Sequence, residues 1–186
     1  MGMIAMRARE LGRSPVVVGD RVAMVGDTSG APDTLARIVR IEERATVLRR
    51  TADDTDPVER VIVANADQLV VVTALADPEP RPRMVDRCLV AAYDAGMDPL
   101  LVLTKSDLAS AEDFLAQYAP LDVPHVVTSV LTEGSEGLAE LRRRLAGRVS
   151  VLVGHSGVGK STLVNALCPD ADRATGHVND VTGRGR

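Results

Sequence analysis

"VLVGHSGVGKSTLVNAL", residues 151–167, is the stretch that decides the fold of this chain. Residues 154–161 match G-x-x-x-x-G-K-[ST], with an apolar strand before them and a helix after them. In such a loop the glycines let backbone N–H groups surround phosphates, Lys160 reaches the β- and γ-phosphates, and Ser161 offers its hydroxyl to Mg²⁺. A chance glycine-rich turn is the alternative, and the strand-loop-helix context argues against it. We therefore predict nucleotide contacts from Gly154, His155, Ser156, Gly157, Val158, Gly159, Lys160, Ser161 and Thr162, with Lys160 as the catalytic group and Ser161 as the metal ligand.

This loop comes late in the chain, and the segments before it alternate between strands and helices from residue 65 onward. Strands are expected within 67–75, 98–107, 124–130 and 148–161, and helices over 81–96, 110–119, 135–147 and 161–167. Continuous apolar strands alternating with helices predict a mostly parallel sheet covered on both faces. Ligands of such sheets bind beyond the carboxyl ends of the strands, where the phosphate-binding loop lies.

"TKSD", residues 104–107, also follows an apolar strand. An aspartate here can accept hydrogen bonds from N1–H and the exocyclic amino group of guanine, a pair of donors that adenine lacks. T-x-x-D is also a helix-start signature, so Ser106 or Asp107 could instead cap the following helix. Lysine usage favours the base-reading role: of 22 basic residues only Lys105 and Lys160 are lysines, and each lies in one of these loops. We predict that Thr104, Lys105, Ser106 and Asp107 bind the nucleotide.

A third loop, "TSVLTEGSEG" at 128–137, follows the strand expected in 124–130. Ser129 and the backbone at Val130 are placed to contact the guanine carbonyl. The alternative is an ordinary strand-to-helix loop.

Residues 1–64 have a different character from the rest. "SPVVVGDRVAMVGD" and "DTLARIVRIEERATVLRR" are rich in β-branched residues and turn signals, and they predict a small all-β domain. The acidic, proline-containing "TADDTDPVE", residues 51–59, is expected to be a loop leading to the second domain. We therefore predict domains at 1–64 and 65–186.

Composition narrows the functional classes. The apolar runs are strand-sized, far short of the roughly 18 residues that a membrane span needs, so we expect a cytoplasmic protein without a membrane partner. Cys88 and Cys168 are far apart and are expected to be buried free thiols rather than metal ligands. The net charge of −4 gives no global attraction to nucleic acid. We expect a monomer.

The order base-reading loop, guanine-edge loop, phosphate loop is that of a circularly permuted GTPase domain. Behind a small β domain it resembles one family, RsgA or YjeQ, the small-ribosomal-subunit-dependent GTPases. The resemblance rests on "VVVGDRV" and "ARIVRIEERATVLRR" for an OB-fold, "VIVANADQLVVVTAL" for the domain junction, and then "TKSD", "GHSGVGKSTLVNAL" and "TGRGR". It implies GTP and GDP binding with Mg²⁺, slow hydrolysis stimulated by the small subunit, and a role in late subunit maturation. Thr104 stands where many GTPases carry Asn, and the family tolerates Thr.

The chain departs from the family pattern at both ends. In the family "GRGR" is followed by a His-Thr-Thr segment, an Asp-x-x-Gly loop and a zinc-binding C-terminal domain, and the OB-fold begins with further strands. We therefore expect either a piece of a longer protein or a chain in which these segments were lost, with an incomplete OB-fold, without the zinc ligands, and with weak hydrolysis. GDP is expected to bind nearly as well as GTP.

The family resemblance also implies contact with ribosomal RNA through the β domain. The predicted contacts are Arg37, Arg40, Arg44, Arg49 and Arg50. The alternative is a solvated arginine-rich face, because residues 1–64 hold ten basic and ten acidic residues and no aromatic ring for base stacking. Two other functions stay open: a guanine-nucleotide-gated RNA-binding module with incidental catalysis, and a P-loop ATPase in which "TKSD" is only a helix cap.

Overall fold

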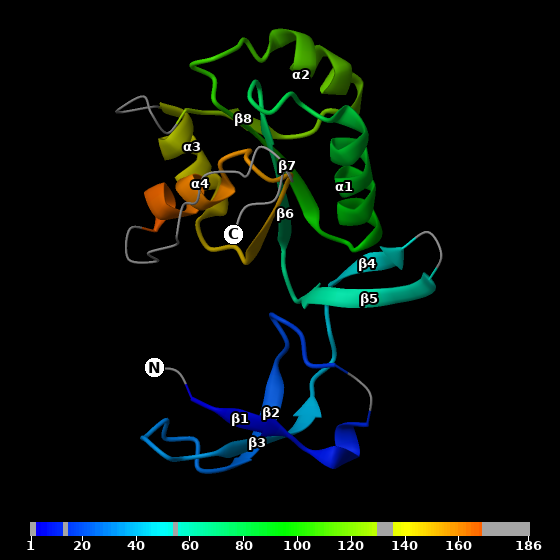
Figure 1. The fold of residues 1–186 in the computed structure, drawn as a ribbon, viewed down its shortest axis with the longest axis vertical. Coiled ribbons are helices and arrows are strands. Elements are labelled where there is room, and N and C mark those ends of the chain that lie inside the picture. Colours follow the sequence, from blue (N-terminus) through cyan, green and yellow to red (C-terminus); the bar gives the residue numbers. More distant parts are fainter. Residues whose placement is uncertain (1–2, 13–14, 54–55, 130–135, 169–186) are drawn as a thin grey trace. The chain divides into compact units, whose positions relative to one another are not determined.

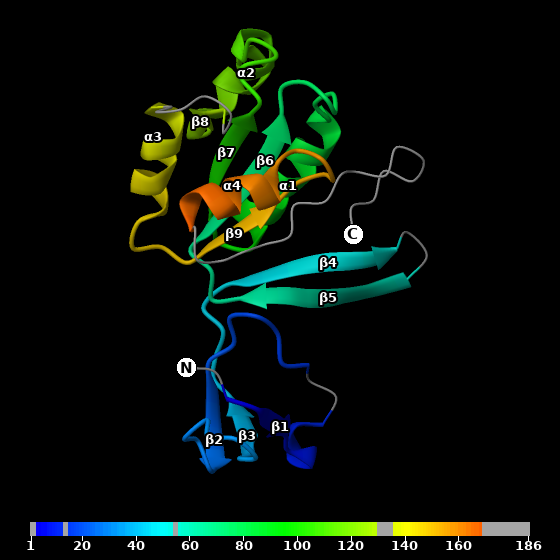
Figure 2. The same ribbon diagram turned by 60° about the vertical axis from the view of Figure 1, so that its left-hand side comes forward.

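The computed structural model describes residues 3–12, 15–53, 56–129 and 136–168. Contacts between residues divide the chain into two compact units, Met1–Ala66 and Asp67–Arg186. Each unit is described by itself below, and Figures 1 and 2 show both of them.

The first sheet of the N-terminal unit contains β1 (Ala5–Arg7), β2 (Val22–Gly26) and β3 (Ala36–Ile41), and the short 3-10 helix η1 (Arg9–Leu11) follows β1. The strand order is β1-β3-β2, with β1 parallel and β2 antiparallel to β3. The register shifts between Ala23 and Met24, so Arg37 pairs with Val25 and Arg40 with Ala23. Because those partners are two residues apart on β2, the bulge brings Arg37 and Arg40 to the same face of the sheet.

The second sheet of this unit is a hairpin of β4 (Val47–Asp53) and β5 (Asp56–Ala64). The expectation of a loop at 51–59 is therefore wrong for residues 51–53 and 56–59, which are strand. A proline is tolerated at position 57 because a two-stranded sheet consists only of edge strands, whose outward N–H groups need no partner. A parallel bridge between Val18 and Val63 joins this hairpin to the segment that precedes β2.

The C-terminal unit is an α/β domain (Figure 1). Its sheet holds β6 (Gln68–Ala74), β7 (Asp98–Thr104), β8 (His125–Val127) and β9 (Ser150–Val153). Its helices are α1 (Pro82–Asp94), α2 (Glu112–Tyr118) with the 3-10 turn η2 (Ala119–Leu121), α3 (Glu136–Leu145) and α4 (Lys160–Leu167). All pairs in this sheet are parallel, as predicted. The helices expected over 81–96 and 135–147 end at Asp94 and Leu145, two residues before Gly96 and Gly147.

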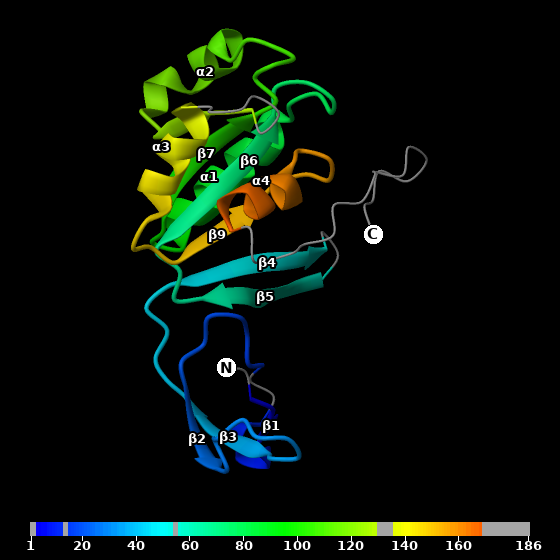
Figure 3. The same cartoon turned by 90° about the vertical axis from the view of Figure 1, so that its left-hand side faces the viewer.

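Alternate residues of the two central strands, β6 and β7, lie on opposite faces of the sheet. One face packs Val70, Val72, Leu100 and Val102 in a core with Leu141 of α3 and Leu163 of α4, all of them buried. Helix α1 covers the opposite face, and the views in Figures 1 and 3 agree on this division. Both central strands are thus buried on both sides, which explains their unbroken apolar runs.

The strand order β8-β7-β6-β9 places the candidate site. The chain adds strands in one direction from β6 through β7 to β8, and then returns to add β9 on the other side of β6. The loops after β6 and β9 therefore leave the sheet at a topological switch point, where parallel sheets bind ligands. The loop after β9, the last described strand, therefore leaves the sheet beside the loop after β6, a much earlier strand.

Candidate functional site

The loop between β9 and α4 has the backbone of a phosphate-binding loop. A Cβ on Gly154 would lie 2.3 Å from the carbonyl oxygen of Val72 in β6, so only glycine allows this approach. Gly159, directly before α4, has a φ of 87°, a left-handed conformation that glycine adopts without strain. The loop thus passes closely over β6 directly before α4 begins, where the free N–H groups of a helix N-terminus can bind phosphate.

Lys160 folds back over this loop. Its Nζ donates hydrogen bonds to the carbonyl oxygens of Gly154, at 2.7 Å, and His155, at 2.6 Å. Burial lowers the pKa of the Lys160 ammonium. Ser161 and Thr162 are exposed on the first turn of α4, so their hydroxyls are available to a ligand.

Thr104, at the end of β7, connects the "TKSD" loop to the loop between β9 and α4. Its side chain is buried, and its hydroxyl donates to the Val158 carbonyl oxygen at 2.7 Å, with the Thr73 carbonyl oxygen 3.3 Å away. The hydroxyl thereby fixes the separation of two loops that are 54 residues apart in sequence.

Asp107 lies on the same side of the sheet. The Ser129 hydroxyl, just beyond β8, donates to Asp107 Oδ1 at 2.5 Å. Both side chains face a cavity of about 310 Å³, which is lined by Asp77, Thr104, Lys105, Asp107, Leu108, Ser129, Gly159 and Thr162. The structure therefore brings together residues from all three predicted loops.

The competing helix-cap interpretation of "TKSD" is wrong. Helix α2 begins at Glu112, five residues beyond Asp107, and the Glu112 amide donates to the hydroxyl of Ser110. Asp107 instead turns toward Ser129.

Lys105 and Ser106 link this loop to its neighbours. Lys105 has a φ of 58° and donates from Nζ to the backbone carbonyl of Asp77, in the loop after β6. The Ser106 amide lies 3.4 Å from the Thr128 carbonyl oxygen as a hydrogen-bond donor. Val130, the remaining predicted contact of the third loop, lies outside the described residues, as does "TGRGR".

Sequence reasoning missed Asp77 and Leu108 as residues lining the cavity. Asp77 was detectable in principle, because it follows the carboxyl end of β6 just as the predicted loops follow β7, β8 and β9. Leu108 adds an apolar surface immediately beyond Asp107, and nothing in the motif signals it.

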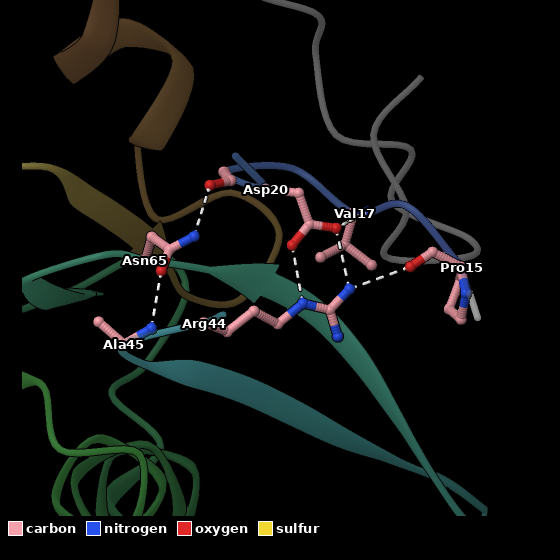
Figure 4. Close-up of polar contacts among 7 residues, drawn as sticks. Pro15, Val17, Asp20, Arg44, Ala45 and Asn65 are labelled. Atoms are coloured by element: carbon pink, nitrogen blue, oxygen red, sulfur yellow. Dashed lines mark hydrogen bonds and ion pairs between the residues drawn. The ribbon is translucent and has the colours of Figure 1, made fainter. Parts of the chain in front are cut away.

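The five arginines predicted to contact RNA have different surroundings. Arg44 forms a part-buried ion pair: its Nε is 2.7 Å from Asp20 Oδ1 and its Nη2 is 2.9 Å from Asp20 Oδ2 (Figure 4). The same guanidinium donates to the Pro15 carbonyl oxygen at 3.0 Å. The Val17 amide donates to Asp20 Oδ2 at 2.8 Å, so the pair closes the turn before β2. These contacts give Arg44 a structural role.

The other four arginines lie on β3 and β4. Arg37 and Arg40 are exposed on one face of the first sheet, and Arg40 pairs with Glu42 at 2.8 Å. Arg49 is exposed on β4. Arg50 is on the same strand, and its side chain lies outside the described ones.

The two cysteines are free thiols. Cys88 is half-buried, and burial raises the pKa of its thiol. Cys168 is exposed, which corrects the expectation that both would be buried, because it follows the last turn of α4 rather than facing the sheet. Across residues 3–12, 15–53, 56–129 and 136–168 there is no cluster of three or more His, Cys, Asp or Glu side chains that could hold a metal. No helix in those same ranges has the length and apolarity of a membrane span.

The fold and the site together define a P-loop nucleotide-binding domain in which the phosphate loop follows the "TKSD" loop in the sequence. Solved structures have a similar fold. The crystal structure of YjeQ from Thermotoga maritima is similar with a TM-score of 0.65 and 30% identity, over 89% of this chain and 56% of that one. YloQ, described as a circularly permuted GTPase, gives a TM-score of 0.59 and 26% identity, over 88% and 54% of the two chains. The predicted circularly permuted GTPase fold is confirmed.

The model of the family described as RsgA GTPase matches residues 41–186, and the chain belongs to this family. A protein of Gemmatimonas aurantiaca named small ribosomal subunit biogenesis GTPase RsgA is 42% identical over 178 residues, 94% of this chain and 57% of that protein. A Pseudomonas syringae pv. tomato protein of the same name is 39% identical over 176 residues, 91% of this chain and 49% of that protein. The chain thus spans about half the length of the curated relatives it matches.

Proposed function

We propose that this chain binds guanine nucleotides as the nucleotide-binding part of a GTPase that acts in biogenesis of the small ribosomal subunit. One observation carries the proposal: Asp107, oriented by Ser129, faces the same 310 Å³ cavity as Gly159 and Thr162 of the phosphate-binding segment. A base reader and a phosphate cradle on one cavity fit a purine nucleotide, and the aspartate selects guanine among the purines.

Guanine selection is assigned to the Asp107 carboxylate. It has two oxygens, and the Ser129 hydroxyl occupies one lone pair of Oδ1, which leaves acceptors for N1–H and the exocyclic amino group of guanine. Adenine presents an acceptor at N1 and would face the carboxylate with repulsion. Leu108 and the stem of Lys105 supply flanking apolar surface in the same cavity.

Phosphate and magnesium binding is assigned to the loop at 154–159 and the first turn of α4. The close approach of Gly154 to β6 and the left-handed Gly159 give a cradle that larger residues would fill. Lys160 can turn its ammonium from the two loop carbonyls to the β- and γ-phosphates, where it counters charge that develops during hydrolysis. The exposed Ser161 hydroxyl is the proposed Mg²⁺ ligand. Bound GTP with Mg²⁺ supplies the phosphoanhydride that is cleaved.

The ribosomal part of the proposal is supported by family membership and by the names of the relatives, which are small ribosomal subunit biogenesis GTPases. It implies a cytoplasmic location and stimulation of GTP hydrolysis by the small subunit. Within the N-terminal unit, proposed to be OB-fold-like, the exposed Arg37, Arg40 and Arg49 are the better candidates for ribosomal RNA contact. Arg44 is a weaker candidate because its guanidinium already forms an ion pair with Asp20.

Competition against a fluorescent GDP analogue tests the nucleotide assignment directly. We expect GDP and GTP to displace the analogue and ADP to fail, with Mg²⁺ tightening the binding. Equal displacement by ADP would contradict the guanine assignment. Turnover measured with and without small ribosomal subunits then separates a stimulated GTPase from a nucleotide-gated RNA-binding module.

A further inference from the structure

The loop after β6 brings an acidic residue, Asp77, to the nucleotide cavity. Asp77 and Asp107 are the two acidic residues among the described ones that line this cavity of about 310 Å³. Asp107 and Ser129 are assigned to the base, and Gly159 and Thr162 belong to the phosphate-binding segment. Neither assignment uses Asp77, although it lines the same cavity.

The strand order places the loop of Asp77 between these two groups of residues. β6 pairs with β7 on one side and with β9 on the other (Figure 3). The "TKSD" loop follows β7 and the phosphate loop follows β9, so the loop after β6 leaves the sheet between them. In a nucleotide the ribose joins the base to the phosphates. A nucleotide with its base at the first loop and its phosphates at the second therefore has its ribose beside the loop of Asp77.

The backbone of Asp77 is held in place, while its carboxylate is available. Its φ of 40° is uncommon for a residue other than glycine, although aspartate is among those that tolerate it best. Its carbonyl oxygen accepts a hydrogen bond from Lys105 Nζ, which ties the loop after β6 to the "TKSD" loop. Asp77 is exposed, and within the described ranges of the chain no hydrogen bond or ion pair engages its carboxylate.

The chemistry of a carboxylate restricts what Asp77 can bind on a guanine nucleotide. An ionised carboxylate only accepts hydrogen bonds, and the negatively charged phosphates repel it. The donors of GDP are N1–H, the exocyclic amino group and the two ribose hydroxyls. The base donors are assigned to Asp107, and a second carboxylate at the same edge of the base would repel the first. The 2′- and 3′-hydroxyls remain, and acidic residues bind ribose hydroxyls in other nucleotide-binding folds.

We propose that the Asp77 carboxylate binds the ribose hydroxyls of the nucleotide and makes the site selective for ribonucleotides over 2′-deoxyribonucleotides. This inference rests on the proposed function for the positions of the base and the phosphates. It goes further, because it makes the sugar a third recognised part of the ligand. It also assigns that role to a residue outside the three loops that the sequence motifs predicted.

The test compares two variants of the same loop that each lose one negative charge. Asp77→Gly removes the carboxylate at a position whose positive φ glycine adopts without strain. Glu79→Gly is the matched control, because Glu79 is exposed, lies two residues further along and is not among the residues lining the cavity. Calorimetric titration measures the Kd values of unlabelled GDP, 2′-deoxy-GDP and ADP for the parent chain and both variants.

The parent chain should bind GDP at least about tenfold more tightly than 2′-deoxy-GDP, which is the equivalent of one hydrogen bond to a charged group. In Asp77→Gly this ratio should fall to about one, and in Glu79→Gly it should stay at the parent value. The ratio is taken within each variant, so a general effect of the substitution on the loop cancels.

Three results would overturn the inference. The first is equal binding of GDP and 2′-deoxy-GDP by the parent chain, and the second is a parent-like ratio in Asp77→Gly. The third is a loss in Asp77→Gly that is equal for both ligands and occurs only with Mg²⁺, because the carboxylate would then act on the metal. The proposed function is checked separately by ADP. If the parent chain rejects ADP but does not distinguish the two sugars, only the role of Asp77 fails, whereas equal binding of ADP and GDP contradicts the guanine site itself.

Discussion

The Ser129 hydroxyl donates a hydrogen bond to Asp107 Oδ1 at 2.5 Å, and this contact connects the loops that follow β8 and β7. The two residues are 22 positions apart, and the parallel pairing of the two strands brings them together. Ser129 thus fixes the position of the Asp107 carboxylate, which we propose to read the base, rather than only lining the cavity.

Replacing Ser129 with Ala should therefore weaken guanine binding without unfolding the domain. Loss of one hydrogen bond to a charged group costs about 1.5–3 kcal/mol at most, so we expect the Kd for GDP to rise between about tenfold and a hundredfold. Ser110→Ala is the matched control, because its hydroxyl accepts from the Glu112 amide at the start of α2 and is not among the residues lining the cavity. If both variants bind GDP like the parent chain, Ser129 does not orient Asp107.

Asp107→Asn should change which base is preferred. The Asn side chain has one acceptor oxygen and one NH₂ donor group, whereas the Asp carboxylate has two acceptor oxygens. The NH₂ group can donate to the extra carbonyl of xanthine but not to the amino group of guanine. We expect the ratio of XDP to GDP affinity to rise by at least about tenfold, the equivalent of one hydrogen bond. Calorimetric titration with both nucleotides measures the ratio, and an unchanged ratio would remove Asp107 from base recognition.

Lys160→Ala should remove most of the affinity that depends on phosphates. The parent chain should bind GDP far more tightly than guanosine, because the ammonium and the loop N–H groups contact only the phosphates. In the variant only the loop N–H groups remain, so the preference for GDP over guanosine should shrink sharply. Arg148→Ala, which removes a cation paired with Asp98 at the opposite ends of the strands, controls for the loss of one positive charge. A variant that still prefers GDP strongly would place the phosphate site elsewhere.

Gly154→Ala tests the close approach of the phosphate loop to β6. The new Cβ would lie 2.3 Å from the Val72 carbonyl oxygen, so the loop must shift and nucleotide affinity should fall at least as far as in Lys160→Ala. Gly96→Ala is the comparison, because its Cβ meets no atom within 4 Å and its cost of about 1–2 kcal/mol is the left-handed backbone alone. Tyrosine fluorescence follows unfolding of the C-terminal unit selectively, since both tyrosines, Tyr93 and Tyr118, belong to it. Normal GDP binding by Gly154→Ala would show that the loop accommodates a Cβ at position 154 without losing the nucleotide site.

Local patterns were sufficient to predict the α/β domain. Apolar runs and one phosphate-loop motif predicted the strands, the helices and the sheet edge at which the candidate site lies. The contacts between the loops of the site could not be predicted from the sequence, because they depend on which strands become neighbours in the sheet. Thr104 reaches Val158 only because β6 pairs with both β7 and β9.

The N-terminal unit shows the same limit more clearly. Residues 51–59 have the acidic and proline-containing composition of a loop, yet pairing across the hairpin makes most of them strand. Arg44 is indistinguishable in sequence from its arginine neighbours. Its role comes from Asp20, 24 positions earlier, and only the fold reveals that contact.

Arg44 and Arg40 should therefore differ sharply in what they contribute to stability. Arg44→Met breaks a pair in which the Asp20 side chain is fully buried and the Arg44 side chain is 20% exposed. Leaving that carboxylate with fewer partners should cost about 2 kcal/mol or more, equivalent to roughly thirtyfold in an opening equilibrium. Arg40→Met removes a solvent-screened, exposed pair with Glu42 and should leave stability almost unchanged.

Hydrogen exchange measures this difference within the unit, which contains no aromatic reporter. The Val17 amide, bonded to Asp20, and the Ala64 amide, bonded to Val18, should lose protection in Arg44→Met and keep it in Arg40→Met. The hydrogen bond from Arg44 holds the pKa of Asp20 below its usual value of 3.8. A lowered carboxyl pKa stabilises the fold fully above that usual value, and the stabilisation is lost as the pH falls through the folded-state pKa. The parent chain should therefore lose protection at these amides below a pH of about 3.8, and Arg44→Met should lose less; equal acid sensitivity in both would show that the ion pair does not hold this turn.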